Sequence, residues 1–333
     1  MGHRQNRTTT ADRAKGQPPR TRFTARRASC LLSLALVAAT VAGCSDGSGP
    51  EAPKLGEGDS WGSLTSGEFH RRYVLHVPPE HDPAQPAPLL ILFHGYSDTG
   101  LTFKWFTGID QITDPLGYLV VYPDGVQGSW AAGCDCTTAD ELGVDDVQFV
   151  EDLIGALADS IAIDSSRIYV AGFSQGAQLV HHLSCSLADR LAGAASVGAT
   201  MSTLVSARCQ PARPLSMLFI QGTLDPTFPW NGIQGLVLSM PATVEYWVQA
   251  NGCDVEPEQA WIPNSADDGT HVLTQTYTGC EEGVEVKLYV VDGGGHTWPS
   301  STAPLPRDRF GRTSYDISAS EQIVEFLRRH TRG

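Results

Sequence analysis

Short apolar runs alternate with amphipathic segments along most of this chain, starting near residue 68. Residues 88–93, 118–122 and 167–172 are mainly apolar runs of strand length, typical of strands buried on both faces of a parallel sheet. Residues 145–154 open with two acids and then place apolar residues at helical spacing. Similar apolar patterns predict further strands at 71–77, 192–197, 215–221 and 284–291, and a final amphipathic helix at 318–330. Strands that alternate with helices predict an α/β fold built on a single doubly wound, mostly parallel sheet.

The segment that precedes this pattern is typical of an export signal. Residues 1–43 contain eight basic residues and one acid, and they include an apolar run at 28–42. That run is short for a membrane span and typical of the hydrophobic part of a secretory signal peptide. It ends in Val41-Ala42-Gly43-Cys44, which resembles the lipobox of bacterial lipoproteins. Cys44 is therefore expected to carry lipid, and two acyl chains on it would anchor the protein stably to a membrane.

Two alternatives stay open for this segment. It is also compatible with an ordinary secretory signal that has a chance cysteine at position 44, and Arg26-Arg27 is compatible with twin-arginine export. Residues 44–67 are rich in Ser, Gly, Pro and acids, so a flexible tether is expected there. Residues 68–333 show no internal repeat and no boundary, which predicts one domain outside the cytoplasm, lipid-anchored or secreted.

The charge balance excludes one class of partner. The whole chain has a net charge of −14, and removing the basic segment 1–43 leaves 15 basic and 36 acidic residues, a net charge of −21, in residues 44–333. A body this acidic repels phosphate backbones. We therefore expect no nucleic-acid partner.

The cysteine count also favours export. Six cysteines remain after Cys30 and Cys44 are set aside, and an even number outside the cytoplasm predicts three disulfides, although six cysteines allow 15 pairings. Pairing neighbours along the chain gives Cys185–Cys209, Cys253–Cys280 and Cys134–Cys136. A zinc site at Cys134-Asp135-Cys136 is the rival interpretation, but no second Cys or His pair lies nearby to complete it, and no metal is expected.

One short motif carries most of the functional signal. Gly172-Phe173-Ser174-Gln175-Gly176 stands where an expected strand meets an expected helix, which is the context of a nucleophile elbow. The tight turn would lift Ser174 above the edge of the sheet, with glycines on both sides where a Cβ would clash. The alternative is a structural serine in a glycine-flanked turn.

A serine nucleophile needs a base, and the base needs an orienting acid. Asp225 follows the strand at 215–221, and His296 follows the strand at 284–291, so both lie on loops at the carboxyl ends of strands, where open α/β sheets place their sites. The order Ser174, Asp225, His296 is the order of α/β hydrolases. Asp292 is a spare acid, but it precedes His296 by only four residues and is poorly placed to reach the imidazole.

The remaining site assignments concern the oxyanion and the pocket. The backbone N–H groups of Tyr96, after the strand at 88–93, and of Gln175, at the start of a helix, are assigned as oxyanion donors. Trp130, Trp230 and Trp298 fall on loops near the expected site. A loop tryptophan is more often a core or lid residue than a substrate contact, but three together are candidates for a stacking surface for a sugar or an aromatic acid. The Gly293-Gly294-Gly295 run lacks the following helix that a dinucleotide loop requires, so no cofactor is expected.

These motifs together resemble secreted esterases of the polyhydroxybutyrate-depolymerase type, grouped with carbohydrate esterase family one. The resemblance covers about residues 68–330 and rests on the motifs at 92–95, 172–176, 222–226 and 294–299. It implies an α/β-hydrolase fold and cofactor-free hydrolysis of short polyester, feruloyl-polysaccharide or acetyl-xylan esters. Two departures from the family pattern bear on the acyl pocket. Tyr96 replaces a small residue or cysteine, and Cys134-Asp135-Cys136 replaces a common Cys-Cys-Gly.

The sequence thus predicts an exported serine esterase whose partners are its ester substrate and, through the lipid, a membrane. Short polyhydroxyalkanoate-type esters or plant-polysaccharide esters are the expected substrates. A narrower alternative is a feruloyl or acetyl-xylan esterase specifically. An alternative of another class is a surface lipoprotein that uses a hydrolase scaffold for binding without catalysis.

Overall fold

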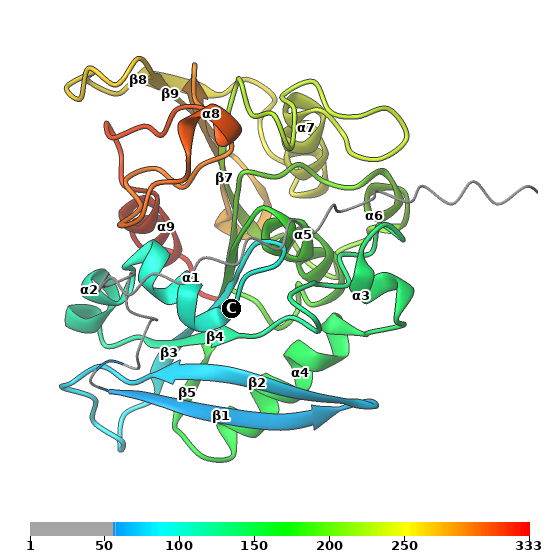
Figure 1. The fold of residues 1–333 in the computed structure, drawn as a ribbon, viewed down its shortest axis with the longest axis vertical. Helices are drawn as coiled ribbons and strands as arrows, with labels where there is room; N and C mark the ends of the chain where they lie inside the picture. Colours follow the sequence, from blue (N-terminus) through cyan, green and yellow to red (C-terminus); the bar gives the residue numbers. More distant parts are fainter. Residues whose placement is uncertain (1–55, 57) are drawn as a thin grey trace, which may run out of the picture. The chain divides into compact units, whose positions relative to one another are not determined.

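The computed structural model describes Gly56 and residues 58–333, whose strands form a ten-stranded sheet covered by helices (Figure 1). The predicted signal segment, the lipidation site at Cys44 and most of the predicted tether lie outside the described residues. The strands are β1 (Asp59–Ser66), β2 (Phe69–His76), β3 (Ala87–Phe93), β4 (Leu119–Pro123), β5 (Ile163–Phe173), β6 (Gly193–Val197), β7 (Ser216–Gly222), β8 (Glu258–Trp261), β9 (His271–Tyr277) and β10 (Val286–Asp292). The α-helices are α1 (Gly100–Thr107), α2 (Asp110–Thr113), α3 (Thr138–Glu141), α4 (Asp146–Ala158), α5 (Gln175–Ser186), α6 (Thr203–Arg208), α7 (Met240–Ala250), α8 (Arg307–Phe310) and α9 (Ala319–Leu327), with 3-10 turns η1 (Asp114–Leu116) and η2 (Glu281–Gly283).

The sheet order confirms the predicted α/β fold. The order is β1-β2-β4-β3-β5-β6-β7-β10-β9-β8. The central strands from β4 to β10 run parallel, and antiparallel pairs extend the sheet at both edges. Since the parallel strands all end at the same edge, the loops after β3, β5, β7 and β10 meet there.

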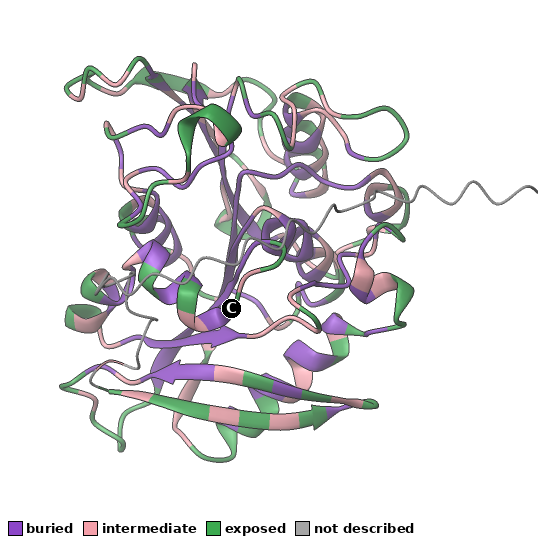
Figure 2. Ribbon diagram, viewed as in Figure 1, coloured by how far each residue is buried: buried purple, intermediate pink, exposed green. Residues whose placement is uncertain are grey.

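The core has two layers because the central strands are buried on both faces. Every residue of β3 is buried, and successive side chains alternate: Leu89 and Ile91 pack on one face, Leu90 and Leu92 on the other. The first face is covered by α4, α5 and α7, and the second by α1 and α9. Figure 2 shows the central strands as buried, whereas the β1–β2 hairpin alternates between buried and exposed residues.

The edges of the sheet differ from the sequence prediction. The tether predicted over residues 44–67 ends earlier, because Asp59–Ser66 form β1, paired antiparallel with β2 through a turn at Gly67. Backbone pairing and the packing of Leu64 against the core stabilise this strand despite its linker-like composition. Strands β8 and β9 were not predicted from the sequence either. All four residues of β8 are exposed, so its sequence contains no pattern of buried apolar residues that would indicate a strand.

All six cysteines of the described region are paired. The bonds are Cys134–Cys136, Cys185–Cys209 and Cys253–Cys280, as neighbour pairing predicts. The rival zinc interpretation fails, because the two sulfurs near Asp140 are bonded to each other and offer no thiolate. Bonds of this kind persist outside the cytoplasm, so the folded protein belongs to an oxidising compartment.

The buried histidine on α5, His181, has a structural role. His181 on α5 is fully buried, and burial lowers its pKa to about 3, so the ring is neutral. Its Nδ1 accepts a hydrogen bond from the indole of Trp247, and its Nε2 faces Ser196 Oγ at 3.2 Å. The side chain is satisfied within the core and has no free nitrogen for a ligand.

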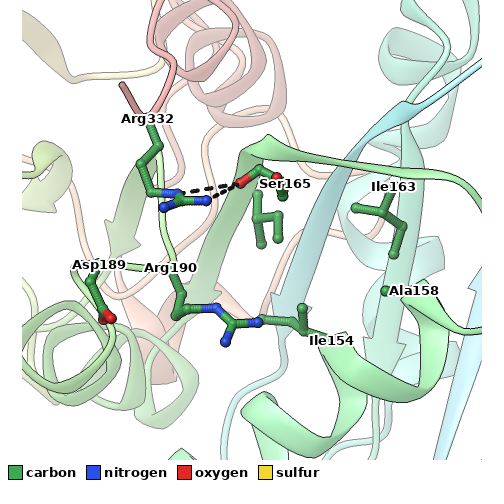
Figure 3. A pocket seen from close by; sticks show the side chains of 8 residues that line it. Ile154, Ala158, Ile163, Ser165, Asp189, Arg190 and Arg332 are labelled. Carbon is green, nitrogen blue, oxygen red and sulfur yellow. Dashed lines mark hydrogen bonds between the residues drawn. The ribbon is translucent and has the colours of Figure 1, made fainter.

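A cavity of 370 Å³ lies at the other end of β5 from Ser174, between the end of α4 and the C-terminal residues (Figure 3). The guanidinium of Arg332 donates to the Ser165 carbonyl there, at 3.0 and 3.4 Å, and the Arg332 backbone N–H donates to Ser166. These hydrogen bonds hold the C-terminal residues against the start of β5, and Ser174 does not line this cavity. Among the described residues, no helix combines the length and the apolar character needed to cross a bilayer.

Candidate active site

The loop between β5 and α5 forces Ser174 into a conformation that few residues adopt. Its φ of 57° and ψ of −122° lie outside the ordinary helix and strand regions. Two glycines permit the turn: a Cβ on Gly172 would lie 2.5 Å from the Gly176 backbone, and a Cβ on Gly176 would lie 2.2 Å from the Phe93 carbonyl oxygen. The predicted elbow is therefore present, with the serine lifted at the carboxyl edge of the sheet.

Three residues from distant parts of the chain meet at this elbow. Ser174 Oγ lies 2.9 Å from His296 Nε2, and His296 Nδ1 lies 2.9 Å from Asp225 Oδ2. The imidazole and the carboxylate are both almost fully buried. Since the carboxylate can only accept, His296 donates its Nδ1 proton to Asp225, which leaves Nε2 free to accept the serine proton.

The carboxylate of Asp225 is fixed on both oxygens. Oδ1 accepts from the backbone N–H groups of Thr227 and Phe228, each at 2.8 Å, and Oδ2 accepts from the side-chain amide of Gln221 at 3.1 Å in addition to His296. Four donors therefore stabilise this carboxylate and hold it toward the imidazole.

The Asp225 and His296 loops meet because β7 and β10 are parallel neighbours. A Cβ on Gly222 would lie 2.4 Å from the carbonyl oxygens of Gly294 and Gly295, so only glycine allows the loops to approach this closely. Asp292, the spare acid of the sequence, is exposed and accepts from the hydroxyl of Thr223. It makes no hydrogen bond to His296.

The loop after β3 lies against the nucleophile. A Cβ on Gly95 would lie 3.3 Å from Ser174 Cβ, so the backbone of Tyr96 follows close beside the serine. His94 is fully buried, and burial lowers its pKa, so the ring is neutral. Its Nδ1 donates to the Gly95 carbonyl at 2.7 Å and its Nε2 accepts from Gly125 N–H at 3.0 Å.

Two backbone donors beside the serine are free. Within the described part of the chain, neither Tyr96 N–H nor Gln175 N–H donates to a protein acceptor. Gln175 begins α5, where backbone N–H groups have no partner in the preceding turn. Its side chain is held from outside the helix, since Oε1 accepts from the backbone N–H of Trp130 at 2.9 Å.

Comparison with known proteins places this chain among esterases. Residues 71–210 match the family model described as "Esterase PHB depolymerase". NocK of Nocardia uniformis subsp. tsuyamanensis is 29% identical over 273 residues, which is 77% of this chain and 79% of that protein. Feruloyl esterase B of Piromyces equi is 32% identical over 242 residues, covering 68% of this chain but only 42% of that longer protein. The chain is an α/β-hydrolase esterase of the polyhydroxybutyrate-depolymerase and feruloyl-esterase type.

A solved structure gives the same fold at greater distance. The esterase superposes on an acetyl xylan esterase from Aspergillus awamori with a TM-score of 0.54 over 75% of this chain and 97% of that one, at 14% identity. At this identity the likeness concerns the fold alone. The esterase is a carboxylic ester hydrolase, and its three disulfides accord with work outside the cytoplasm.

The three tryptophans do not form the stacking surface for which they were candidates, and Trp130 and Trp298 follow the core alternative. Trp130 and Trp298 are fully buried, and their indoles donate to the His94 carbonyl and to Ser320 Oγ. Trp230 is partly buried and packs against the core. None of the three lines the cavity in front of Ser174, because Trp130 and Trp298 are packed inside the core and Trp230 packs against it.

The cavity that does open onto Ser174 has a volume of 760 Å³ and mostly apolar walls. Besides His296, its aromatic lining comes from Tyr96 in the loop after β3, from Trp105 and Phe106 of α1, from Phe173 and from Phe310 of α8. The sequence analysis did not identify Trp105 and Phe106 as lining residues. Helical spacing could have indicated them, since Thr102, Trp105 and Phe106 lie on one face of α1. Asp98 and Arg309 are the charged residues among those that line it.

Proposed function

We propose that this esterase works through a serine acyl-enzyme mechanism, with Ser174 as nucleophile, His296 as general base and Asp225 as the orienting acid. The observation that carries the proposal is the pair of 2.9 Å contacts that joins the hydroxyl to the imidazole and the imidazole to the carboxylate. This is the order of donors and acceptors that the chemistry requires.

The proposed reaction has two halves. Ser174 Oγ attacks the ester carbonyl while its proton passes to His296 Nε2, and the developing oxyanion accepts hydrogen bonds from the N–H groups of Tyr96 and Gln175. The alcohol then leaves with the proton from His296. Water attacks the acyl-enzyme in the same way and releases the acid. Each oxyanion donor would contribute about 3 kcal/mol to transition-state stabilisation.

The substrates that we propose are short polyhydroxyalkanoate-type esters or plant-polysaccharide esters. The apolar 760 Å³ cavity supports an acyl group larger than acetate. The names of relatives support the narrower alternative, since they include feruloyl esterase D of Neurospora crassa, 26% identical over 294 residues, as well as the Piromyces enzyme. The aromatic rings of Trp105, Phe106 and Phe173 favour feruloyl over acetyl-xylan esters within that alternative.

A substrate panel on the purified protein tests this proposal. We expect hydrolysis of methyl ferulate and of hydroxybutyrate oligomers with larger kcat/KM values than acetylated xylan gives, because only the first two substrates fill the cavity. A higher value for acetylated xylan would contradict the role of the cavity. A fluorophosphonate probe tests the alternative of another class: failure of the folded protein to react would favour a binding protein without catalysis.

We also propose that the esterase is exported and held to a membrane by lipid on Cys44. The lipobox-like residues 41–44 and the short apolar run before them support this localisation. Mass spectrometry of the protein from its native host should find an N-terminal Cys44 whose sulfur carries a thioether-linked diacylglycerol, which supplies the two acyl chains. An unmodified N-terminus, or cleavage at another residue, would contradict the anchor and support the ordinary secretory signal.

A further inference from the structure

The segment 305–312, which contains α8, is basic although the rest of the protein is acidic. Residues 305–312 contain three arginines and one acid, Asp308, whereas residues 44–333 as a whole carry a net charge of −21. Arg309 lines the same 760 Å³ cavity as Ser174 and His296. Arg307 and Arg312 line an adjoining cavity of 390 Å³ instead.

Backbone contacts hold this segment to the loop of the proposed base. His296 N–H donates to the Phe310 carbonyl at 2.6 Å, and Gly295 N–H donates to the Arg312 carbonyl at 2.9 Å. The fit allows no side chain on Gly295, because a Cβ there would lie 2.0 Å from the Phe310 carbonyl oxygen. The segment that carries Arg309 therefore keeps a fixed position relative to His296.

Aromatic contacts extend this constraint to the side chains. The Phe310 ring stacks on the His296 imidazole with a centroid distance of 6.2 Å and an interplanar angle of 29°. The Arg309 guanidinium carbon lies 5.0 Å from the centroid of the Phe310 ring. The Phe310 ring therefore contacts both the Arg309 guanidinium and the imidazole of His296, the proposed base.

The Arg309 guanidinium makes no ion pair with any residue that the structure describes, whereas Arg213 and Arg329 pair with Glu282 and Glu285. The acid that shares the cavity, Asp98, comes from the loop before α1 and accepts a hydrogen bond from Thr99 N–H. An anionic group in this cavity is thus attracted to α8 and repelled by Asp98. Guanidinium groups bind carboxylates with paired N–H donors, which fixes orientation as well as charge.

We propose that Arg309 is a specificity-determining residue that binds a carboxylate on the substrate, so that the esterase prefers esters carrying a free carboxylate a few bonds from the scissile carbonyl. This proposal rests on the proposed serine mechanism at the same site. The carboxylate takes no part in the bond changes, and its binding favours the substrate orientation that points it away from Asp98.

Matched pairs of esters test the proposal. Mono-4-nitrophenyl adipate and 4-nitrophenyl hexanoate have acyl chains of equal length and differ in a carboxylate on the acid side. The second pair, 4-acetoxybenzoate and its methyl ester, places the carboxylate on the alcohol side. The quantity measured for each pair is the ratio of kcat/KM for the anionic ester to kcat/KM for the neutral ester.

Arg309→Gln should lower this ratio about threefold to tenfold in at least one pair, mainly through KM, as expected for a partly solvated charge pair. Arg309→Glu should lower it further, and added salt should lower it in the wild type. The matched control is Arg307→Gln, which removes the same charge from the same short helix but does not line the catalytic cavity. Its ratio should stay at the wild-type value.

An unchanged ratio in Arg309→Gln for both pairs would overturn the proposal, and so would an equal fall in Arg307→Gln, which would show a general field effect instead of a contact. Failure of the proposed function gives a different result, because hydrolysis of the neutral hexanoate ester would then survive Ser174→Ala, whatever the ratios are.

Discussion

Ser174→Ala is expected to lower kcat for 4-nitrophenyl butyrate by about 10⁴-fold to 10⁶-fold, the range seen when the nucleophile of a hydrogen-bonded triad is removed. The reason is the loss of one atom. Alanine leaves the backbone turn in place and removes only the Oγ that lies 2.9 Å from His296 Nε2. The residual rate would come from water attacking a carbonyl that the oxyanion donors still polarise. Steady-state kinetics with enough enzyme to resolve the slow variant measure the effect.

The control for this variant is Ser186→Ala, at the other end of the same helix α5, where the serine is exposed. Ser186→Ala should keep the wild-type kcat, and both variants should unfold at temperatures close to the wild type. A Ser174→Ala protein that is folded and retains more than about a hundredth of the wild-type kcat would mean that another group attacks the ester. The proposed mechanism would then be wrong even though the fold and the family are established.

The parallel centre of the fold was predictable because its signal is local. Strands buried on both faces must be apolar throughout, so residues 88–93 and 118–122 indicate β3 and β4 without any knowledge of their neighbours. The outer strands carry no such signal. The β1 strand has the composition of a linker, and β8 is exposed along its whole length, so both depend on pairing partners that lie elsewhere in the chain.

The same distinction applies to the site. Positions of Ser174, Asp225 and His296 follow from a topological rule, since loops at the carboxyl ends of neighbouring parallel strands must meet. The lining of the cavity obeys no such rule. Trp298 follows His296 by two residues and is nevertheless buried, whereas Arg309 reaches the cavity because Gly295 packs against the Phe310 carbonyl. Contacts between loops that are distant in the sequence determine which residues line the cavity, and the periodicity of the sequence does not indicate such contacts.

Asp225→Asn is expected to lower kcat by about 10⁴-fold, because it reverses a hydrogen bond without changing the shape of the side chain. The asparagine oxygen would keep the Oδ1 position, where Thr227 and Phe228 donate their backbone N–H groups. Its NH₂ group would then take the Oδ2 position, where it donates toward His296 Nδ1 and no longer accepts from the side-chain amide of Gln221. The imidazole could accept that bond only with its proton on Nε2, where it can no longer take the proton of Ser174.

Asp292→Asn is the matched control, since it makes the same chemical change at the acid that stands closest to His296 in the sequence. Its Oδ1 accepts only from the Thr223 hydroxyl, a bond that an asparagine oxygen also accepts. We expect a kcat within about twofold of the wild type for this variant, as for other exposed substitutions that leave the site intact.

If instead Asp292→Asn loses activity and Asp225→Asn keeps it, the orienting acid is Asp292, and the loop that carries it must move when substrate binds. Comparable losses in both variants would point to a carboxylate network shared between the two loops, because the hydrogen bonds of Thr223 connect Asp292 to the strand end that precedes Asp225.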